Sequence, residues 1–135
     1  MDPVLVDSSV WVGYFRRGHT ADANDLDLLL KSSAVCLTAI IRAELLSGVQ
    51  TEKDYRMLSD RLSAVHMLPE FPELWDQAAH ARFRLARRGL QASLLDLSIA
   101  ALSAHYRCPL FTADLDFKPI ASVLPVKFYR PLPRS

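Results

Sequence analysis

Four acidic positions of this chain lie where an acid is costly, at the edges of apolar segments. They are Asp7 after Val4–Val6, Glu44 in IIRAELLSG, Asp96 inside LLDLSIAALSA, and Asp114, with Asp116 close behind, after Leu110-Phe111-Thr112. A buried carboxylate without a partner is strongly destabilising, or it takes up a proton. Hard divalent cations such as Mg²⁺ take oxygen ligands, and they activate water and neutralise the charge of a phosphodiester transition state. The acids therefore predict a shared, cation-binding pocket.

Most of these acids also have a purely structural interpretation. Asp7 can cap the helix that follows it, because Asp is a favoured N-cap residue and complements the helix dipole. Ser93 and Asp96 form a capping-box pattern, in which the acid reaches back to the cap. Asp114 and Asp116 can be turn residues after a strand. Taken singly, each of these acids is open to either interpretation.

Glu44 is the hardest of the acids to explain structurally. Ile40 and Ile41 lie four and three residues before it, and Gly48 lies four residues after it. Helical spacing predicts Glu44 on the apolar stripe of its helix, although a rotated helix would place it on the solvated face. Considered jointly, the acids favour one pocket.

Short apolar runs alternate with longer helical ones along the chain. The pattern predicts strands at 3–7, 34–37, 64–67, 110–112 and 126–128. It predicts helices at 9–18, 21–31, 39–48, 51–62 and 72–88, and a sixth that begins at 93. The expected helix caps are Ser8 or Ser9, Thr38 and Ser93, with Pro72 opening the long helix and Gly89 stopping it.

Strands separated by helices require parallel crossovers. The expected fold is therefore α/β, a three-layer α/β/α sandwich around a central parallel sheet of about five strands. Ligands bind such sheets beyond the carboxyl ends of the strands, which is where Asp7 and Asp114 are expected.

Composition restricts the class of protein. The chain has 135 residues, 50% hydrophobic and 23% charged, which fits a single domain over residues 1–135. Its formal net charge of +1 means that a nucleic-acid partner must be held by a local basic patch. Cys36 and Cys108 are isolated, which predicts buried thiols in a reducing compartment. Without a secretory signal or a membrane-length apolar run, we expect a cytoplasmic protein with no membrane partner.

Basic residues supply the expected contacts to a phosphate backbone. Arg82, Arg84, Arg87 and Arg88 gather near the end of the long helix, where cations also complement the helix dipole. Arg16, Arg17 and Lys118 lie next to the predicted pocket in the sequence. We expect contacts to RNA at Arg16, Arg17, Arg87 and Lys118.

The ordered set of motifs resembles the PIN-domain ribonucleases, and within them the toxins of the VapBC type. The matching segments are VLVDSSVWVGYF, the helix of Glu44, RRGLQASLLDLSIAALSA and LFTADLDF, which together run from Pro3 to about Phe128. The specificity lies in the order of the motifs, since no single one is diagnostic. One departure is Arg107-Cys108-Pro109, where the family often has Gly before the fourth strand. It concerns a turn and no catalytic residue.

The resemblance implies a metal-dependent endoribonuclease that is the toxin of a type II toxin–antitoxin pair. It implies that Asp7, Glu44, Asp96 and Asp114 are catalytic, that Asp7, Asp96 and Asp114 bind Mg²⁺ or Mn²⁺, and that Ser9, Thr112 and Asp116 support the site. It also implies an RNA substrate, a homodimer and a small antitoxin that blocks the pocket.

Two other classes of function compete with this interpretation. A PIN-like binding module would hold RNA or a protein without cleaving it, but such a scaffold has no need of buried carboxylates. A phospho-acceptor signalling domain also gathers acids at strand ends. It needs a further acid after the third strand, where Met67-Leu68-Pro69 stands.

Apolar residues suggest where the antitoxin binds. Those around Trp11, Tyr14 and Phe15 on the first helix, with Leu45 and Leu46 on the Glu44 helix, exceed what one small core requires. We expect a groove there that accepts an amphipathic antitoxin segment, with an Arg reaching the acids. A core or dimer-interface role is the alternative.

Overall fold

The computed structural model describes residues 2–17 and 20–132 of the chain. The strands are β1 (Val4–Val6), β2 (Val35–Leu37), β3 (His66–Met67) and β4 (Leu110–Phe111). The helices are α1 (Ser8–Arg17), α2 (Ala21–Lys31), α3 (Ala39–Ser47), α4 (Glu52–Leu62), α5 (Leu74–Arg87) and α6 (Leu94–Tyr106). Two short 3₁₀ helices, η1 (Leu115–Phe117) and η2 (Pro119–Ser122), follow β4.

The four strands form one parallel sheet in the order β3-β2-β1-β4. The central strand β1 is buried throughout, and its Leu5 pairs with Cys36 of β2 on one side and Leu110 of β4 on the other. Uninterrupted apolar strands of this kind are typical of a parallel sheet that helices cover on both faces. The α/β prediction is therefore confirmed.

The predicted fifth strand at 126–128 is reduced to a single parallel bridge between Leu110 and Phe128. The Leu110 N–H donates to the Lys127 carbonyl at 2.8 Å, and the Tyr129 N–H donates to the Leu110 carbonyl at 2.9 Å. Pro125 and Pro131 lie on either side of this segment and have no N–H to donate, so the pairing cannot extend. The sheet thus has four strands instead of about five.

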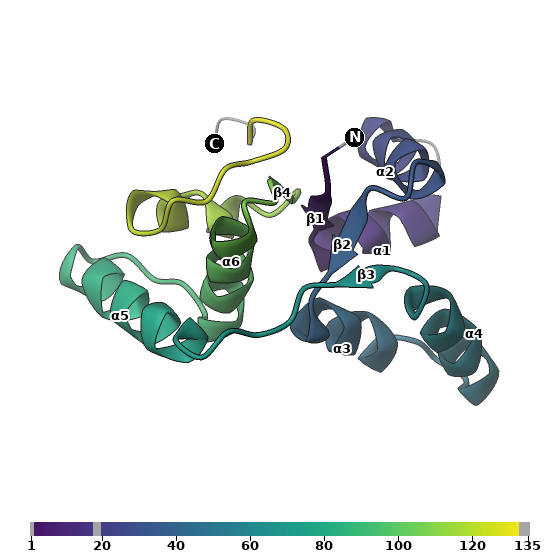
Figure 1. Cartoon of the computed structure of the whole chain (residues 1–135), viewed down its shortest axis with the longest axis horizontal. Coiled ribbons are helices and arrows are strands. Elements are labelled where there is room, and N and C mark those ends of the chain that lie inside the picture. Colours follow the sequence, from purple (N-terminus) through teal and green to yellow (C-terminus); the bar gives the residue numbers. More distant parts are fainter. Residues whose placement is uncertain (1, 18–19, 133–135) are drawn as a thin grey trace.

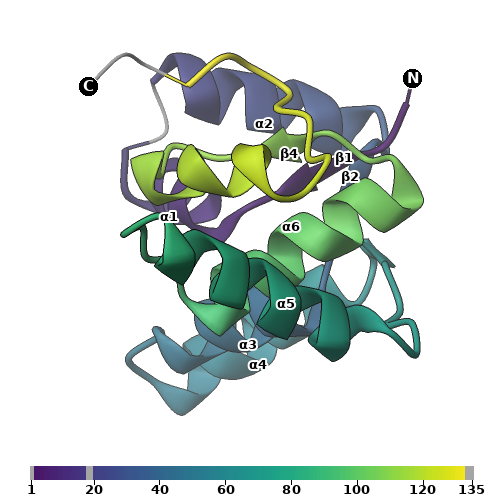
Figure 2. The ribbon, with the colours of Figure 1, turned by 90° about the vertical axis from the view of Figure 1, so that its left-hand side faces the viewer.

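Helices surround the sheet in layers (Figure 1). Helices α5 and α6 pack together on one side, and α1 and α2 pack together on the other. Helices α3 and α4 lie beyond one end of the strands, where α3 contacts both α1 and α6. Figure 2 shows α5 in front of α6 when the molecule is seen from that side. Helix α3 thus links the helix that follows β1 to the helix that carries Asp96.

The predicted helix ends are mostly confirmed. Thr38 and Ser93 accept hydrogen bonds from the backbone N–H of Ile41 and Asp96, at 3.1 and 3.0 Å, and so cap α3 and α6. Gly89 follows α5 with φ of 72°, a conformation that favours glycine.

Two helix starts were predicted wrongly. Helix α1 already includes Ser8 and Ser9, because Asp7 takes the cap position and accepts from the Ser9 N–H. Helix α5 begins at Leu74, since Pro72 lies within a turn in which the Leu74 N–H donates to the Phe71 carbonyl at 3.1 Å.

The two cysteines are buried free thiols, as predicted. Burial raises the pKa of Cys36 to about 12, so this thiol stays protonated and unreactive. Among residues 2–17 and 20–132, no helix has the length and apolar character needed to cross a bilayer.

Candidate active site

The site begins where the neighbouring strands β1 and β4 end. Asp7 directly follows β1, and its N–H donates to the carbonyl of Phe111, the last residue of β4, at 2.9 Å. Thr112 and Asp114 follow β4. The carboxyl ends of parallel strands meet at one edge of a sheet, so sheet pairing brings together residues from opposite ends of the chain.

Asp7 is buried, with 4% of its surface exposed, and one of its oxygens takes all of its hydrogen bonds within the described residues. Oδ2 accepts from the Ser9 hydroxyl at 2.7 Å, from the Thr112 hydroxyl at 2.9 Å and from the Ser9 N–H at 3.3 Å. Three donors therefore fix the position of this oxygen. Oδ1 accepts no hydrogen bond in that part of the chain and is left for another ligand.

The hydroxyls of Ser9 and Thr112 each link Asp7 to the loop after β4. Ser9 Oγ accepts from the Ala113 N–H at 3.0 Å, and Thr112 Oγ1 accepts from the Asp114 N–H at 3.0 Å. Each hydroxyl donates its one hydrogen to Asp7. The 3.3 Å contact between Ser9 Oγ and Thr112 Oγ1 is therefore not a hydrogen bond. The predicted supporting residues Ser9 and Thr112 therefore fix both the carboxylate and the Asp114 loop.

Asp114 lies on that loop, and Asp116 lies in the short helix η1 that follows it. Asp114 is half-buried and caps η1, since its Oδ1 accepts from the Asp116 N–H at 2.9 Å. Asp116 is exposed. The turn interpretation of Asp114 is thus correct, but it uses only one carboxylate oxygen and does not exclude a second role.

Asp96 lies in the first turn of α6 and faces the same region. Its pKa is raised to about 6, first by desolvation and then by the negative charges of Asp7 and Asp114, with a smaller contribution from Asp116. A hydrogen bond with Ser93 opposes this shift. Asp96 therefore belongs both to the predicted helix cap and to a cluster of like charges. A cation placed among these acids would relieve their repulsion.

Glu44 is exposed, so the prediction that it lies on the apolar stripe of its helix is wrong. The buried stripe of α3 is formed by Ile41, Leu45 and Leu46, and Glu44 lies at its margin beside half-buried Ile40. Its carboxyl is nonetheless part of the cluster. Partial desolvation raises its pKa most, and the charges of Asp7 and Asp96 raise it further, while a hydrogen bond with Ser8 lowers it.

The negative charges of Asp7 and Asp96 act on Glu44, and those of Asp7 and Asp114 act on Asp96, so these four acids lie in one region of the structure. In the described part of the chain, no three His, Cys, Asp or Glu side chains converge tightly enough to hold one ion between them. Mg²⁺ is usually held by one or two carboxylates and keeps several waters, so it does not require such a group. The ligands that Mg²⁺ requires are carboxylate oxygens without cationic partners, and among the described residues Asp7 Oδ1 and the carboxyl of Asp96 are of this kind.

A cavity of about 640 Å³ opens beside the acids. Its wall includes Asp96 and Asp116 together with Ser93, Gln91 and Arg82. Arg82 belongs to the predicted basic cluster, whereas the contact to RNA was predicted at Arg87. Arg82 lies one turn after Ala78, which the structure buries, and so flanks the packed face of α5. Which face of α5 packs is a tertiary property, so the sequence alone does not favour Arg82 over Arg87.

Most of the basic residues that were predicted to contact RNA do not lie at the acids. The guanidinium of Arg87 lies 4.5 Å from the centre of the Phe83 ring on the same helix. Arg16 and Lys118 are exposed, and neither lines the cavity beside the acids. The side chain of Arg17 lies outside what the structure describes.

Comparison with known proteins gives consistent matches over most of the chain. The PIN domain model matches residues 4–123. VapC ribonuclease Mb1587 of Mycobacterium bovis and ribonuclease VapC11 of Mycobacterium tuberculosis are each 29% identical over 124 residues, which cover 89% of this chain and 92% of theirs.

Solved structures match the fold. DNA-bound VapBC from Salmonella typhimurium superposes with a TM-score of 0.75 at 17% identity, covering 95% of this chain and 97% of the other. VapBC2 from Rickettsia felis, bound to a DNA fragment from its promoter, gives 0.73 at 19% identity, with coverages of 93% and 96%. At these identities the likeness concerns the fold.

Proposed function

Because the chain belongs to the PIN-domain family, we propose that it is an endoribonuclease that depends on Mg²⁺ or Mn²⁺ and acts as the toxin of a toxin–antitoxin pair. The observation that carries this proposal is the convergence of Asp7, Glu44, Asp96 and Asp114 at the carboxyl edge of the sheet, where no cationic side chain neutralises them in the described residues. The ribonuclease names of the VapC relatives support it.

Asp7 and Asp96 are the principal metal ligands in this proposal, and Asp114 would act through a water that the cation keeps. When bound, the cation supplies water activation and neutralises charge on the phosphodiester. Ser9 and Thr112 hold Asp7 so that Oδ1 stays free. Asp116, exposed in η1 after Asp114, adds negative charge at the rim. Together these residues form an anionic pocket, and the cation would offset the repulsion between this pocket and the RNA phosphate that is cut.

Glu44 has a different role in this proposal. It is exposed at the margin of α3, and its pKa is raised by partial desolvation and by neighbouring acids. A carboxyl whose pKa lies closer to the working pH is better suited to proton transfer. We assign to Glu44 the holding and release of a proton at its side-chain oxygens as the phosphodiester is cut.

The antitoxin would bind in a separate apolar groove. A cavity of about 610 Å³ is lined by Trp11, Tyr14 and Phe15 of α1 and by Met57, Leu58 and Leu62 of α4. Apolar walls of this kind, with Phe15 and Met57 exposed, suit an amphipathic segment. The solved VapBC structures that share this fold, including the toxin–antitoxin system VapBC-5 of Mycobacterium tuberculosis, support such a partner.

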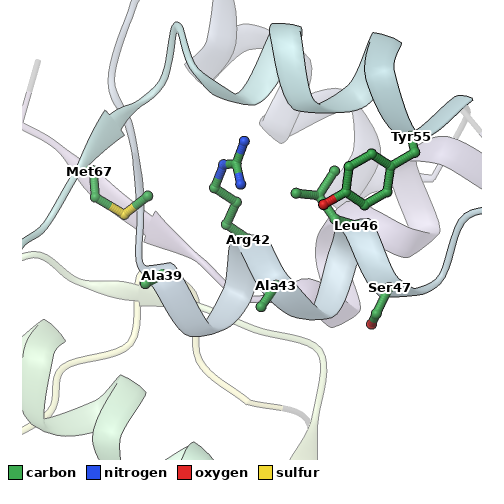
Figure 3. Close-up of a pocket in the computed structure, with 7 residues that line it drawn as sticks. All are labelled: Ala39, Arg42, Ala43, Leu46, Ser47, Tyr55 and Met67. Carbon is green, nitrogen blue, oxygen red and sulfur yellow. The ribbon is translucent and has the colours of Figure 1, made fainter. Parts of the chain in front are cut away.

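Leu45 and Leu46 do not line this groove, contrary to our expectation. Leu46 borders a different hollow of about 550 Å³, with Arg42, Tyr55 and Met67 (Figure 3). Arg42 reaches from α3 to α4, where it donates to the Ser59 hydroxyl at 2.8 Å. The antitoxin proposal therefore rests on the α1–α4 groove alone.

Homodimerisation, a single domain over residues 1–135 and a cytoplasmic location complete the proposal. The family resemblance supports the dimer. Light scattering of the purified protein would measure its mass directly. The two buried free thiols suit a reducing compartment.

The test is a cleavage assay with purified protein and labelled RNA. We expect cleavage with Mg²⁺ or Mn²⁺, none in chelator, and loss of activity in Asp7→Asn. RNA binding without cleavage under any of these ions would instead identify a catalytically silent binding module.

A further inference from the structure

The four arginines of the α5 region have different surroundings. Arg87 stacks over Phe83, and Arg88 donates to the Ser122 hydroxyl at 3.2 Å. Arg84 is exposed and borders none of the cavities described above. Arg82 alone of the four lines the cavity that also contains Asp96 and Asp116. Figure 2 shows how α5 crosses in front of α6, the helix that carries Asp96.

Arg82 is a free cation at an acid-lined cavity. Across the described residues it forms no ion pair, although Asp96 and Asp116 line the same cavity. The guanidinium therefore does not neutralise the acid cluster and remains available to an anion. Arg is the side chain best suited to phosphate, because its planar fork donates two parallel hydrogen bonds.

The wall of the cavity thus carries both signs of charge. Asp96 and Asp116 can take a cation, Arg82 can take an anion, and the amide of Gln91 lies in the same wall. Its volume of about 640 Å³ lies within the range of pockets that take a small ligand or a segment of one. With a cation held by the acids, a polyanionic strand can place one phosphate at that cation and the next at Arg82, since successive phosphates are joined by one nucleoside.

We infer that Arg82 binds the RNA phosphate next to the one that is cut and so sets the strand in register with the acids. This inference rests on the proposed nuclease function and assigns to Arg82 the role that the sequence had suggested for Arg87. A contact of this kind positions the backbone and carries no base specificity.

The test measures binding of a short, fluorescein-labelled single-stranded RNA by anisotropy, in chelator so that hydrolysis is absent, over a series of salt concentrations. Arg82→Gln is compared with Arg84→Gln, which removes the same charge from the same helix away from the cavity. We expect Arg82→Gln to weaken binding by about five- to tenfold and to lower the salt slope by about 0.7, the value for one lost single-strand phosphate contact.

Arg84→Gln should change affinity by less than about twofold, as expected for a charge that makes no direct contact. Arg82→Lys should keep the salt slope but only part of the affinity, because it keeps the charge without the fork. Melting curves of all three variants should match the wild type, since Arg82 is exposed.

Equal effects of Arg82→Gln and Arg84→Gln would overturn the inference while leaving the nuclease proposal intact, because wild-type cleavage in Mg²⁺ tests that proposal separately. A wild type that binds no RNA in chelator would overturn the inference alone, and one that also cleaves no RNA in Mg²⁺ would overturn both.

Discussion

The Thr112 hydroxyl donates to Asp7 Oδ2 at 2.9 Å across 105 positions of sequence. The bond joins the carboxyl ends of β4 and β1, and the same hydroxyl oxygen accepts from the Asp114 N–H. Two of the candidate catalytic acids are thus positioned by one side chain.

Thr112→Val should weaken both the fold and the activity. It removes a donor to a buried carboxylate, which we expect to cost about 1–3 kcal/mol of unfolding free energy. RNA cleavage should fall as well, because Asp7 loses a positioning contact. Thr112→Ser keeps the hydroxyl and is the matched control. Urea unfolding and initial cleavage rates on the same preparations would measure both effects, and a valine variant equal to wild type in both would refute this role.

The metal-free protein should lose stability as the pH rises through the range in which the Asp96 carboxyl titrates. The pKa of Asp96 is about 6 in the folded protein, against an ordinary value of 3.8. Between these values the folded state holds a proton that the unfolded chain has released, so stability falls with increasing pH and levels off above the folded pKa. The raised pKa of Glu44 acts in the same direction.

Chemical unfolding in chelator across this window, for wild type and Asp96→Asn, would measure the effect. The variant should lack the part of the fall that Asp96 causes, and saturating Mg²⁺ should reduce the fall in the wild type by replacing the proton. Parallel curves for the two proteins would show that Asp96 does not titrate in this window.

The sequence predicted the features that depend on local chemistry. Thr38 and Ser93 were recognisable as caps, and Asp7 and Asp114 as acids at strand ends, because each signal lies within a few residues. The exposure of Glu44 depends on how α3 is rotated against its neighbours, and the preference for Arg82 over Arg87 depends on the face of α5 that packs. Those are tertiary properties. The apolar residues of each helix span a wide face, so their pattern in the sequence does not fix how the helix is rotated against its neighbours.

The α1–α4 groove can be tested with exposed residues. Phe15 is 50% exposed and Met57 is 44% exposed, so alanine at either position should leave the fold intact. We expect each change to weaken antitoxin binding by about 1–2 kcal/mol, as for an interface anchor. Trp11 and Leu46 are buried and would report on folding instead.

Co-purification and titration with the cognate antitoxin would measure the change, with Phe83→Ala, an exposed aromatic on α5, as the control. If Phe83→Ala weakens binding while the groove variants do not, the antitoxin binds on the α5 side.

Arg107→Gly should stabilise the protein. Arg107 ends α6 with φ of 54° and ψ of 38°, a left-handed conformation that costs a side-chain-bearing residue about 1 kcal/mol and costs glycine almost nothing. This is the position near which the related family often has Gly. We expect a melting temperature higher by a few degrees, whereas Arg107→Ala, which keeps the Cβ, should give no gain. An equal rise in both variants would attribute the effect to the lost charge.

The most direct test is the initial rate of RNA cleavage as a function of Mn²⁺ concentration for wild type and Asp96→Asn. Asp60→Asn, on exposed α4, serves as the control for loss of an acid. We predict no cleavage by the wild type in chelator, saturable activation by Mn²⁺, a rate at least about 100-fold lower in Asp96→Asn, and wild-type behaviour in Asp60→Asn. Asp96→Asn should remain folded, because it removes one of several mutually repelling charges. Wild-type cleavage in chelator, or an Asp96→Asn protein as active as the wild type, would contradict the assignment of the acids as a cation-dependent nuclease site.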